Sequence, residues 1–157
     1  MGVSFERRLR THAEARSAAF EAASVCPQRW QVAEALMELL ANAIEHGSLG
    51  IGHEMKARCR AAGTWEAELA RRAEQPDLGR RMVLLRRVKT CDGWRFEVRD
   101  EGAGFDWRGW RGFDSARQSA PCGRGIALVE QWLPGCLSYE EAGRVACLEL
   151  ARNPGSA

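Results

Sequence analysis

Glu38 and Asn42 lie one helical turn apart, and together they could bind a metal ion and accept a proton. They lie in the stretch ELLANAIEHG, residues 38–47. Residues four apart on a helix point the same way. Asparagine is a poor mid-helix residue, and its amide oxygen is a hard ligand suited to Mg²⁺. A carboxylate one turn earlier can orient a hydroxyl or a water molecule and accept its proton.

A second segment, VRDEGAGF at residues 98–105, places an aspartate at the end of an expected strand. There Asp100 can accept a hydrogen bond from an exocyclic amine. Gly102 and Gly104 lack a Cβ, so a flat ring or a phosphate can approach their backbone closely. The segment therefore suits a ligand that carries a planar ring with an amino group.

A third segment, CGRGIALV at residues 122–129, leads a G-x-G directly into an expected helix. The free backbone N–H groups after Gly123 and Gly125 and the positive end of the helix dipole form an anion site. Arg124 can add a charge-assisted contact to a phosphate. The segment is neither a Walker A loop nor a Rossmann fingerprint, because it lacks the lysine and follows a long loop instead of a strand.

Each segment alone also has an ordinary structural explanation. The helix has an apolar face, and its opposite face would simply be solvated. That polar face comprises Glu34, Glu38, Asn42 and Glu45. The second segment would be a glycine-rich turn with an aspartate cap, and the third a glycine turn at a helix entry. The combination of the three is more informative than any one of them.

The helices and strands that must position these segments can be predicted from the spacing of apolar residues and from the residues that end helices and strands. Helices are expected over 12–24, over 28–46 with Gly47 as the stop, and over 126–132. Strands are expected over 2–10, 82–88, 94–99, 137–139 and 145–150. Residues 101–123 form a long loop, which in a compact domain is usually functional, and residues 153–157 a frayed tail.

This order of elements predicts an α+β fold, a two-layer sandwich with helices on one face of a mixed, mostly antiparallel sheet. It is not the strict alternation of a doubly wound fold. The whole chain, residues 1–157, is expected to be one domain. Residues 48–81 are predicted to form a polar helical insertion, with short helices over 54–62 and 64–74.

Bulk composition excludes several classes of protein. The 157 residues include 23 basic and 21 acidic side chains, and the net charge of +2 gives no case for a nucleic-acid or membrane partner. None of the 6 cysteines forms a C-x-x-C pair, so reduced thiols are expected. No apolar run approaches a membrane span and no signal peptide is evident, so a cytoplasmic protein is expected.

The three segments together resemble the GHKL ATPase superfamily. Glu38-x-x-x-Asn42-x-x-x-His46-Gly47 resembles its N box, and Asp100-x-Gly102-x-Gly104-Phe105 its G1 box. The run Gly123-x-Gly125-Ile126-x-Leu128-Val129 resembles its G2 box, and the stretch 106–122 takes the place of the ATP lid. The resemblance covers roughly residues 20–150. The N-box ending and the small size are most similar to the anti-sigma-factor serine kinases, which implies the Bergerat ATP-binding fold.

The resemblance implies a role for each matching residue. Asn42 would hold Mg²⁺ against the phosphates of ATP, and Glu38 would be the general base. Asp100 would accept the adenine amino group. The other implied nucleotide-binding residues are His46, Gly102, Gly104, Phe105, Gly123, Arg124, Gly125 and Ile126.

The resemblance also implies a substrate and partners. The substrate would be a serine on a STAS-domain anti-sigma antagonist, a sigma factor would be a second partner, and a homodimer is common in that class. Two alternatives stay open: a nucleotide-binding module that sequesters a partner without kinase activity, and an ATPase or histidine-kinase core. The last is disfavoured by the short stretch before the N-box helix, where His12 is the one histidine.

Two features depart from the simplest members of that class. The insertion 48–81 is longer than they carry and would cover or create a partner surface. Trp107 and Trp110 flank the expected lid entrance, where they would pack the lid hinge or offer an aromatic platform to a partner.

Overall fold

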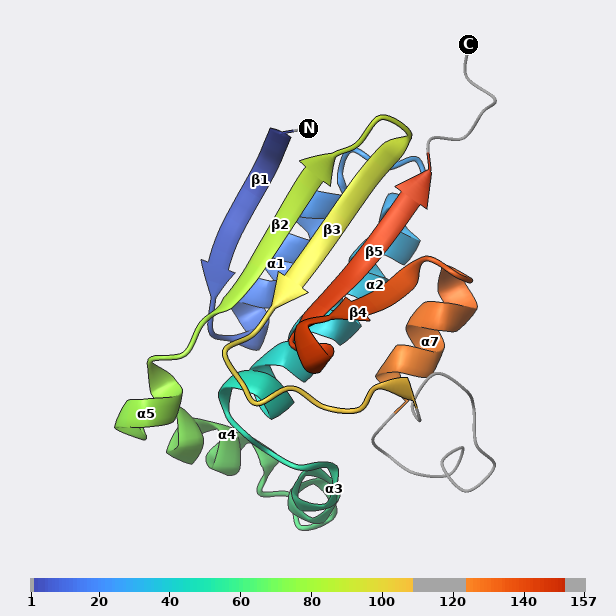
Figure 1. Ribbon diagram of the computed structural model, residues 1–157. Helices are drawn as coiled ribbons and strands as arrows, with labels where there is room; N and C mark the ends of the chain where they lie inside the picture. The colour runs from blue at the N-terminus through green and yellow to red at the C-terminus, as the bar shows by residue number, and fades with distance from the viewer. Residues whose placement is uncertain (1, 109–123, 152–157) are drawn as a thin grey trace.

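The computed structural model describes residues 2–108 and 124–151, which form a five-stranded antiparallel sheet with helices (Figure 1). The strands are β1 (Gly2–Leu9), β2 (Val83–Lys89), β3 (Gly93–Arg99), β4 (Leu137–Glu140) and β5 (Val145–Ala151). Their spatial order is β1-β2-β3-β5-β4. The predicted α+β class is confirmed.

Every neighbouring pair among the described strands is antiparallel, so the sheet is not the mixed one that was expected. The pairs β2–β3 and β4–β5 are consecutive and reverse direction through short turns, as hairpins do. Strands β3 and β4 run in the same direction, but β5 lies between them. The crossover through the long loop therefore creates no parallel pair.

Two helices, α1 (His12–Ala23) and α2 (Arg29–Asn42), lie together behind the sheet in Figure 1. A capping box starts α1: the Thr11 hydroxyl accepts from the Glu14 backbone N–H, and the Glu14 carboxylate accepts from that of Thr11. Alanines on α1 and leucines on α2 are buried against Phe96, Leu85 and Leu148 of the sheet. The third helix that packs here is α7 (Gly125–Trp132).

The end of the long helix differs from the prediction. Beyond Asn42 the chain makes a π-helical turn, η1 (Ala43–Ser48), so Gly47 lies inside the turn and does not stop the helix. A π turn contains one more residue than an α turn and rotates the side chains that follow it. Glu45, which lies inside this turn, is 3% exposed, so it is not part of a solvated face with Glu38.

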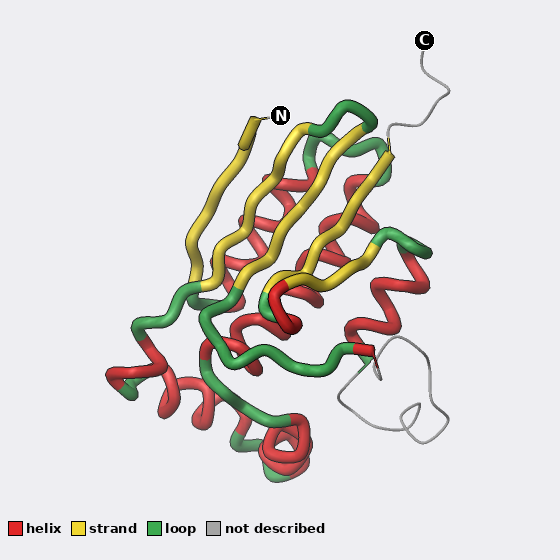
Figure 2. The backbone as a smooth tube through the Cα atoms, in the orientation of Figure 1, coloured by secondary structure: helices red, strands yellow, loops and turns green. Residues whose placement is uncertain are grey.

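The insertion forms three short helices, α3 (His53–Ala61), α4 (Trp65–Ala73) and α5 (Pro76–Gly79). None of their residues is buried. They lie beyond one end of the sheet, near the start of β2 and the end of β3 (Figure 2). The two predicted helices are present within one residue at each end, and α5, which was not predicted, begins at Pro76.

A short helical turn, η3 (Glu141–Gly143), connects β4 to β5. The cysteines of the described segments (Cys26, Cys59, Cys91, Cys136 and Cys147) are free thiols, as expected. In the same segments no helix is both long and apolar enough to span a bilayer. The predictions for Gly123, for Cys122 and Trp110, for most of the lid and for the tail lie outside the described residues.

Candidate functional site

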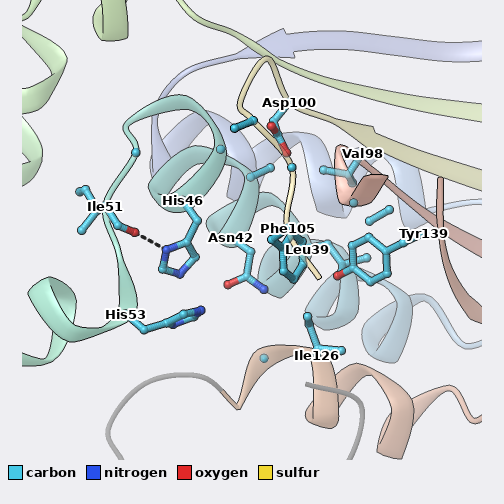
Figure 3. A pocket seen from close by; sticks show the side chains of 18 of the residues that line it. Leu39, Asn42, His46, Ile51, His53, Val98, Asp100, Phe105, Ile126 and Tyr139 are labelled. Atoms are coloured by element: carbon cyan, nitrogen blue, oxygen red, sulfur yellow. Dashed lines mark hydrogen bonds between the residues drawn. The ribbon is translucent and has the colours of Figure 1, made fainter. Parts of the chain in front are cut away.

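A pocket of about 350 Å³ lies where η1, the end of β3 and the start of α7 meet (Figure 3). That volume is in the range of small-molecule sites. Its lining includes these predicted site residues: Asn42, His46, Asp100, Gly104, Phe105, Gly125 and Ile126. Glu38, Gly102 and Arg124 are not in the lining. The structure thus brings parts of all three sequence segments to one cavity.

Asp100 is fixed by glycines on both sides. Its Oδ1 accepts a hydrogen bond of 2.7 Å from the Gly102 backbone N–H. A Cβ built on Gly47 would lie 2.5 Å from the same oxygen, and one on Gly102 would lie 2.6 Å from the Gly47 carbonyl. Both positions must therefore be glycine for the backbone at residues 47 and 102 to lie this close to the Asp100 carboxylate. Gly102 does not line the pocket, but it holds Asp100 in place.

Burial raises the pKa of Asp100 above its ordinary value, although the Gly102 hydrogen bond and the charges of Arg144 and Arg81 oppose the shift. No other side-chain hydrogen bond to this carboxylate occurs within the described segments. Asp100 can therefore accept a hydrogen bond from a ligand in the pocket.

The wall beside Asp100 is apolar and aromatic. Leu39, Val98, Ile126 and Ala146 supply aliphatic surface. The ring of Tyr139 meets Phe105 edge-on, with centroids 5.5 Å apart. It also stacks on Trp107 at 5.3 Å. A flat, partly apolar ligand fits such a wall.

The backbone of the η3 turn holds this wall in place. The Phe105 N–H donates to the Ala142 carbonyl at 3.0 Å, and a Cβ on Gly143 would lie 3.0 Å from the Phe105 nitrogen. Gly143 has a φ of +89° and Gly104 a φ of +80°, which other residues rarely adopt. The β4–β5 turn is thus part of the site, and sequence reasoning had treated it only as a turn.

At the other end of the pocket, Asn42 and Glu38 of α2 face the first residue of α7. A Cβ on Gly125 would lie 2.6 Å from Glu38 Oε2 and 3.3 Å from Asn42 Nδ2. Glu38 is half-buried beside the pocket. Burial raises the pKa of Glu38, and the charges of Glu45 and Glu34 add to the shift, while Lys56 opposes it. A carboxyl with a raised pKa next to a cavity is a candidate proton acceptor.

His46 faces the pocket from η1, where its Nδ1 bonds to the Ile51 carbonyl. Burial lowers the pKa of His46, so the ring is neutral at pH 7. Its ring lies 4.1 Å from that of His53, at 42° between the planes. Sequence reasoning missed His53, Ile51 and the neighbouring Gly50 and Gly52. The spacing of glycines 47, 50 and 52 is the signal that could have marked this loop.

Hydrogen bonds of charged side chains connect the insertion to the segment that lines the pocket. Glu45 of η1 accepts hydrogen bonds from Lys56 of α3 and, at 2.9 Å, from His12 of α1. Burial alone would raise the pKa of Glu45, but these two partners outweigh it and lower the pKa. In addition, Arg72 of α4 donates to the Leu49 carbonyl at 3.0 Å and to that of Gly50 at 3.1 Å. The insertion thereby positions the loop that carries His53.

Within residues 2–108 and 124–151 no group of three or more His, Cys, Asp or Glu side chains is arranged to hold a metal ion. No protein-family model matches the chain, and no curated protein matches it either.

Proposed function

We propose that the pocket binds ATP with Mg²⁺ and that the protein is a serine/threonine-protein kinase of the anti-sigma-factor type. The observation that carries this proposal is the convergence of Asn42, Asp100 and Gly125 on one cavity. These residues are far apart in the sequence and belong to the N, G1 and G2 boxes that the chain resembles. Glycine turns and helix faces without a shared function would not be expected to line one cavity.

The adenine end of the proposed site is the Asp100 side. A carboxylate that accepts from the exocyclic amine gives base specificity, and the Gly47 and Gly102 contacts hold that carboxylate still. The aliphatic and aromatic wall offers the faces on which a purine packs. Together these features fit an adenine ring better than a sugar or a peptide.

The phosphate end is the Asn42 side. The start of α7 offers backbone N–H groups and the positive end of the helix dipole, as an anion site requires. Asn42 would be a protein ligand of Mg²⁺, which characteristically takes few protein ligands plus phosphate oxygens. Bound there, Mg²⁺ would neutralise phosphate charge during transfer. Gly123, Arg124 and the lid 106–122 would close over the phosphates.

The remaining features agree with a Bergerat arrangement, in which the helices α1, α2 and α7 form the layer behind the sheet. Glu38 favours a kinase over a nucleotide-dependent binding module, because a pure binder needs no proton acceptor beside the phosphate site. The proposed substrate is a serine of a STAS-domain anti-sigma antagonist in the cytoplasm. A sigma factor and a second copy of the chain are the further proposed partners, with no nucleic acid or membrane.

The test is transfer of labelled γ-phosphate from ATP to STAS-domain proteins encoded in the same genome. We expect an acid-stable phosphoserine on one of them, and at least a hundredfold slower transfer by Glu38→Gln with unchanged ATP affinity. Nucleotide binding without transfer to any STAS protein would favour the sequestering module. Acid-labile phosphate on the chain itself would favour a histidine-kinase core.

A further inference from the structure

Two of the three histidines of this chain lie side by side in the pocket wall. His46 comes from η1 and His53 is the first residue of α3. Their ring centroids are 4.1 Å apart and the ring planes are tilted by 42°. Figure 3 shows both imidazoles on the same side of the cavity, next to Asn42.

The hydrogen bond of His46 determines which of its nitrogens is available. Nδ1 bonds to the Ile51 carbonyl, which can only accept, so Nδ1 carries the proton. In the neutral ring Nε2 then holds a lone pair. That atom is buried and has no hydrogen-bond partner among the described residues. A buried acceptor without a donor is costly, and this one belongs to a side chain that lines a cavity.

Imidazoles that bind metal ions almost always donate their second N–H to a carbonyl or carboxylate, which fixes the tautomer and the ring orientation. The Ile51 carbonyl provides that support for His46. The arrangement at His46 therefore matches a prepared metal ligand in each of these respects.

We propose that His46 and His53 hold a divalent first-row transition-metal ion of the Zn²⁺, Ni²⁺ and Co²⁺ class. Figure 3 shows the amide oxygen of Asn42 turned toward the two rings, and it is the natural third ligand. Water would complete the coordination. Imidazole suits these ions, whereas Mg²⁺ prefers oxygen ligands. The ion thus differs in chemistry from the magnesium proposed above, although Asn42 would serve both, and its binding by the two imidazoles does not require nucleotide.

The spacing of the rings is compatible with one shared ion. A metal–imidazole nitrogen bond is about 2.0–2.1 Å long. The two rings are close neighbours, with centroids 4.1 Å apart, and they would turn and separate slightly to direct one nitrogen each at the same ion. Glu45, the carboxylate next to His46, is not available as a ligand because His12 and Lys56 already occupy it.

The test is calorimetric and spectroscopic titration of the nucleotide-free protein with CoCl₂. We expect one equivalent to bind, with the visible absorption of Co²⁺ held by nitrogen and oxygen and without thiolate charge-transfer bands. Either His46→Gln or His53→Gln should weaken binding at least tenfold, a usual effect at supported metal sites. His12→Gln is the matched control, since it removes the one other histidine, and it should bind as wild type does.

A second measurement uses the wild-type protein alone, so it does not depend on the folding of a variant. Paramagnetic Co²⁺ should broaden the imidazole NMR signals of His46 and His53 at one equivalent and leave His12 sharp. Unbroadened His46 and His53 signals, thiolate bands, or undiminished binding by both pocket variants would overturn the proposal. ATP affinity, measured separately, tests the proposed function, so the two can fail independently.

Discussion

Replacement of Glu45 by leucine tests whether the buried charge cluster holds the insertion on the pocket. Glu45 is 3% exposed and its partner Lys56 is 11% exposed. Glu45→Leu keeps a side chain of similar bulk but leaves the largely covered Lys56 without a carboxylate. Removal of one partner from a buried ion pair costs about 3–5 kcal/mol. For a chain of this size each kcal/mol lowers Tm by about 2–4 °C, so a fall of roughly 6–20 °C is expected.

Two comparisons separate this effect from a general loss of packing. The double variant Glu45→Leu/Lys56→Met should recover most of the loss, because a buried ion pair replaced by apolar residues is often neutral or stabilising. Glu21→Gln breaks the Arg7–Glu21 pair, whose side chains are 53% and 52% exposed. It should cost about 0–1 kcal/mol.

The assay is chemical denaturation at several pH values. The pKa of Glu45 is below its ordinary value of 4.5, so its contribution is full above pH 4.5 and is lost as the pH falls through the lowered pKa. The gap between wild type and Glu45→Leu should therefore be largest near neutral pH and shrink below 4.5. An equal loss in the double variant, or a gap that does not change with pH, would refute the reasoning.

Three further predictions concern the pocket and its support. Gly125→Ala places a Cβ 2.6 Å from Glu38 Oε2 and should weaken ATP binding at least tenfold by calorimetry, whereas Gly2→Ala, with open space around it, should not. The transfer rate of wild type should fall in acid with a midpoint above 4.5, because the pKa of Glu38 is raised from that value and the base must be ionised; a pH-independent rate would argue against this base. Arg72→Met removes two charged hydrogen bonds to loop carbonyls and should cost about 2–3 kcal/mol in denaturation experiments. Arg71→Met removes the ion pair between Arg71, whose side chain is 56% exposed, and Glu68, a carboxylate that Arg72 also contacts. It should cost less than about 1 kcal/mol.

Local signals in the sequence predicted most element positions. The helix expected over 12–24 matches α1 within one residue, and the strands expected over 82–88, 94–99 and 145–150 match β2, β3 and β5 within one residue at each end. The strand order could not be predicted in this way. It depends on the pairing of β1 with β2 and of β3 with β5, which are long-range choices that no local pattern specifies.

Only those residues of the candidate site that belong to local sequence motifs could be predicted. Asn42, Asp100 and Gly125 carry recognisable local motifs, and the structure brings them together. His53 carries none: it reaches the pocket only because η1 turns the chain and Arg72 fixes the following loop. A helical wheel drawn at 100° per residue placed Glu45 on the solvated face, but it lies in a π turn and is buried against His12 and Lys56. Such turns depend on tertiary packing and are common at functional sites.

The proposed function requires this pocket to bind ATP through Asp100 at one end and through Mg²⁺ at the other. Calorimetric titration of nucleotide-free protein with a non-hydrolysable ATP analogue, with and without Mg²⁺, tests it most directly. Binding should depend on Mg²⁺, and Asp100→Asn should weaken it about tenfold to a hundredfold, the effect of losing about 1.5–3 kcal/mol from one charged hydrogen bond. No binding by the wild type, or equal binding by Asp100→Asn, would contradict the account.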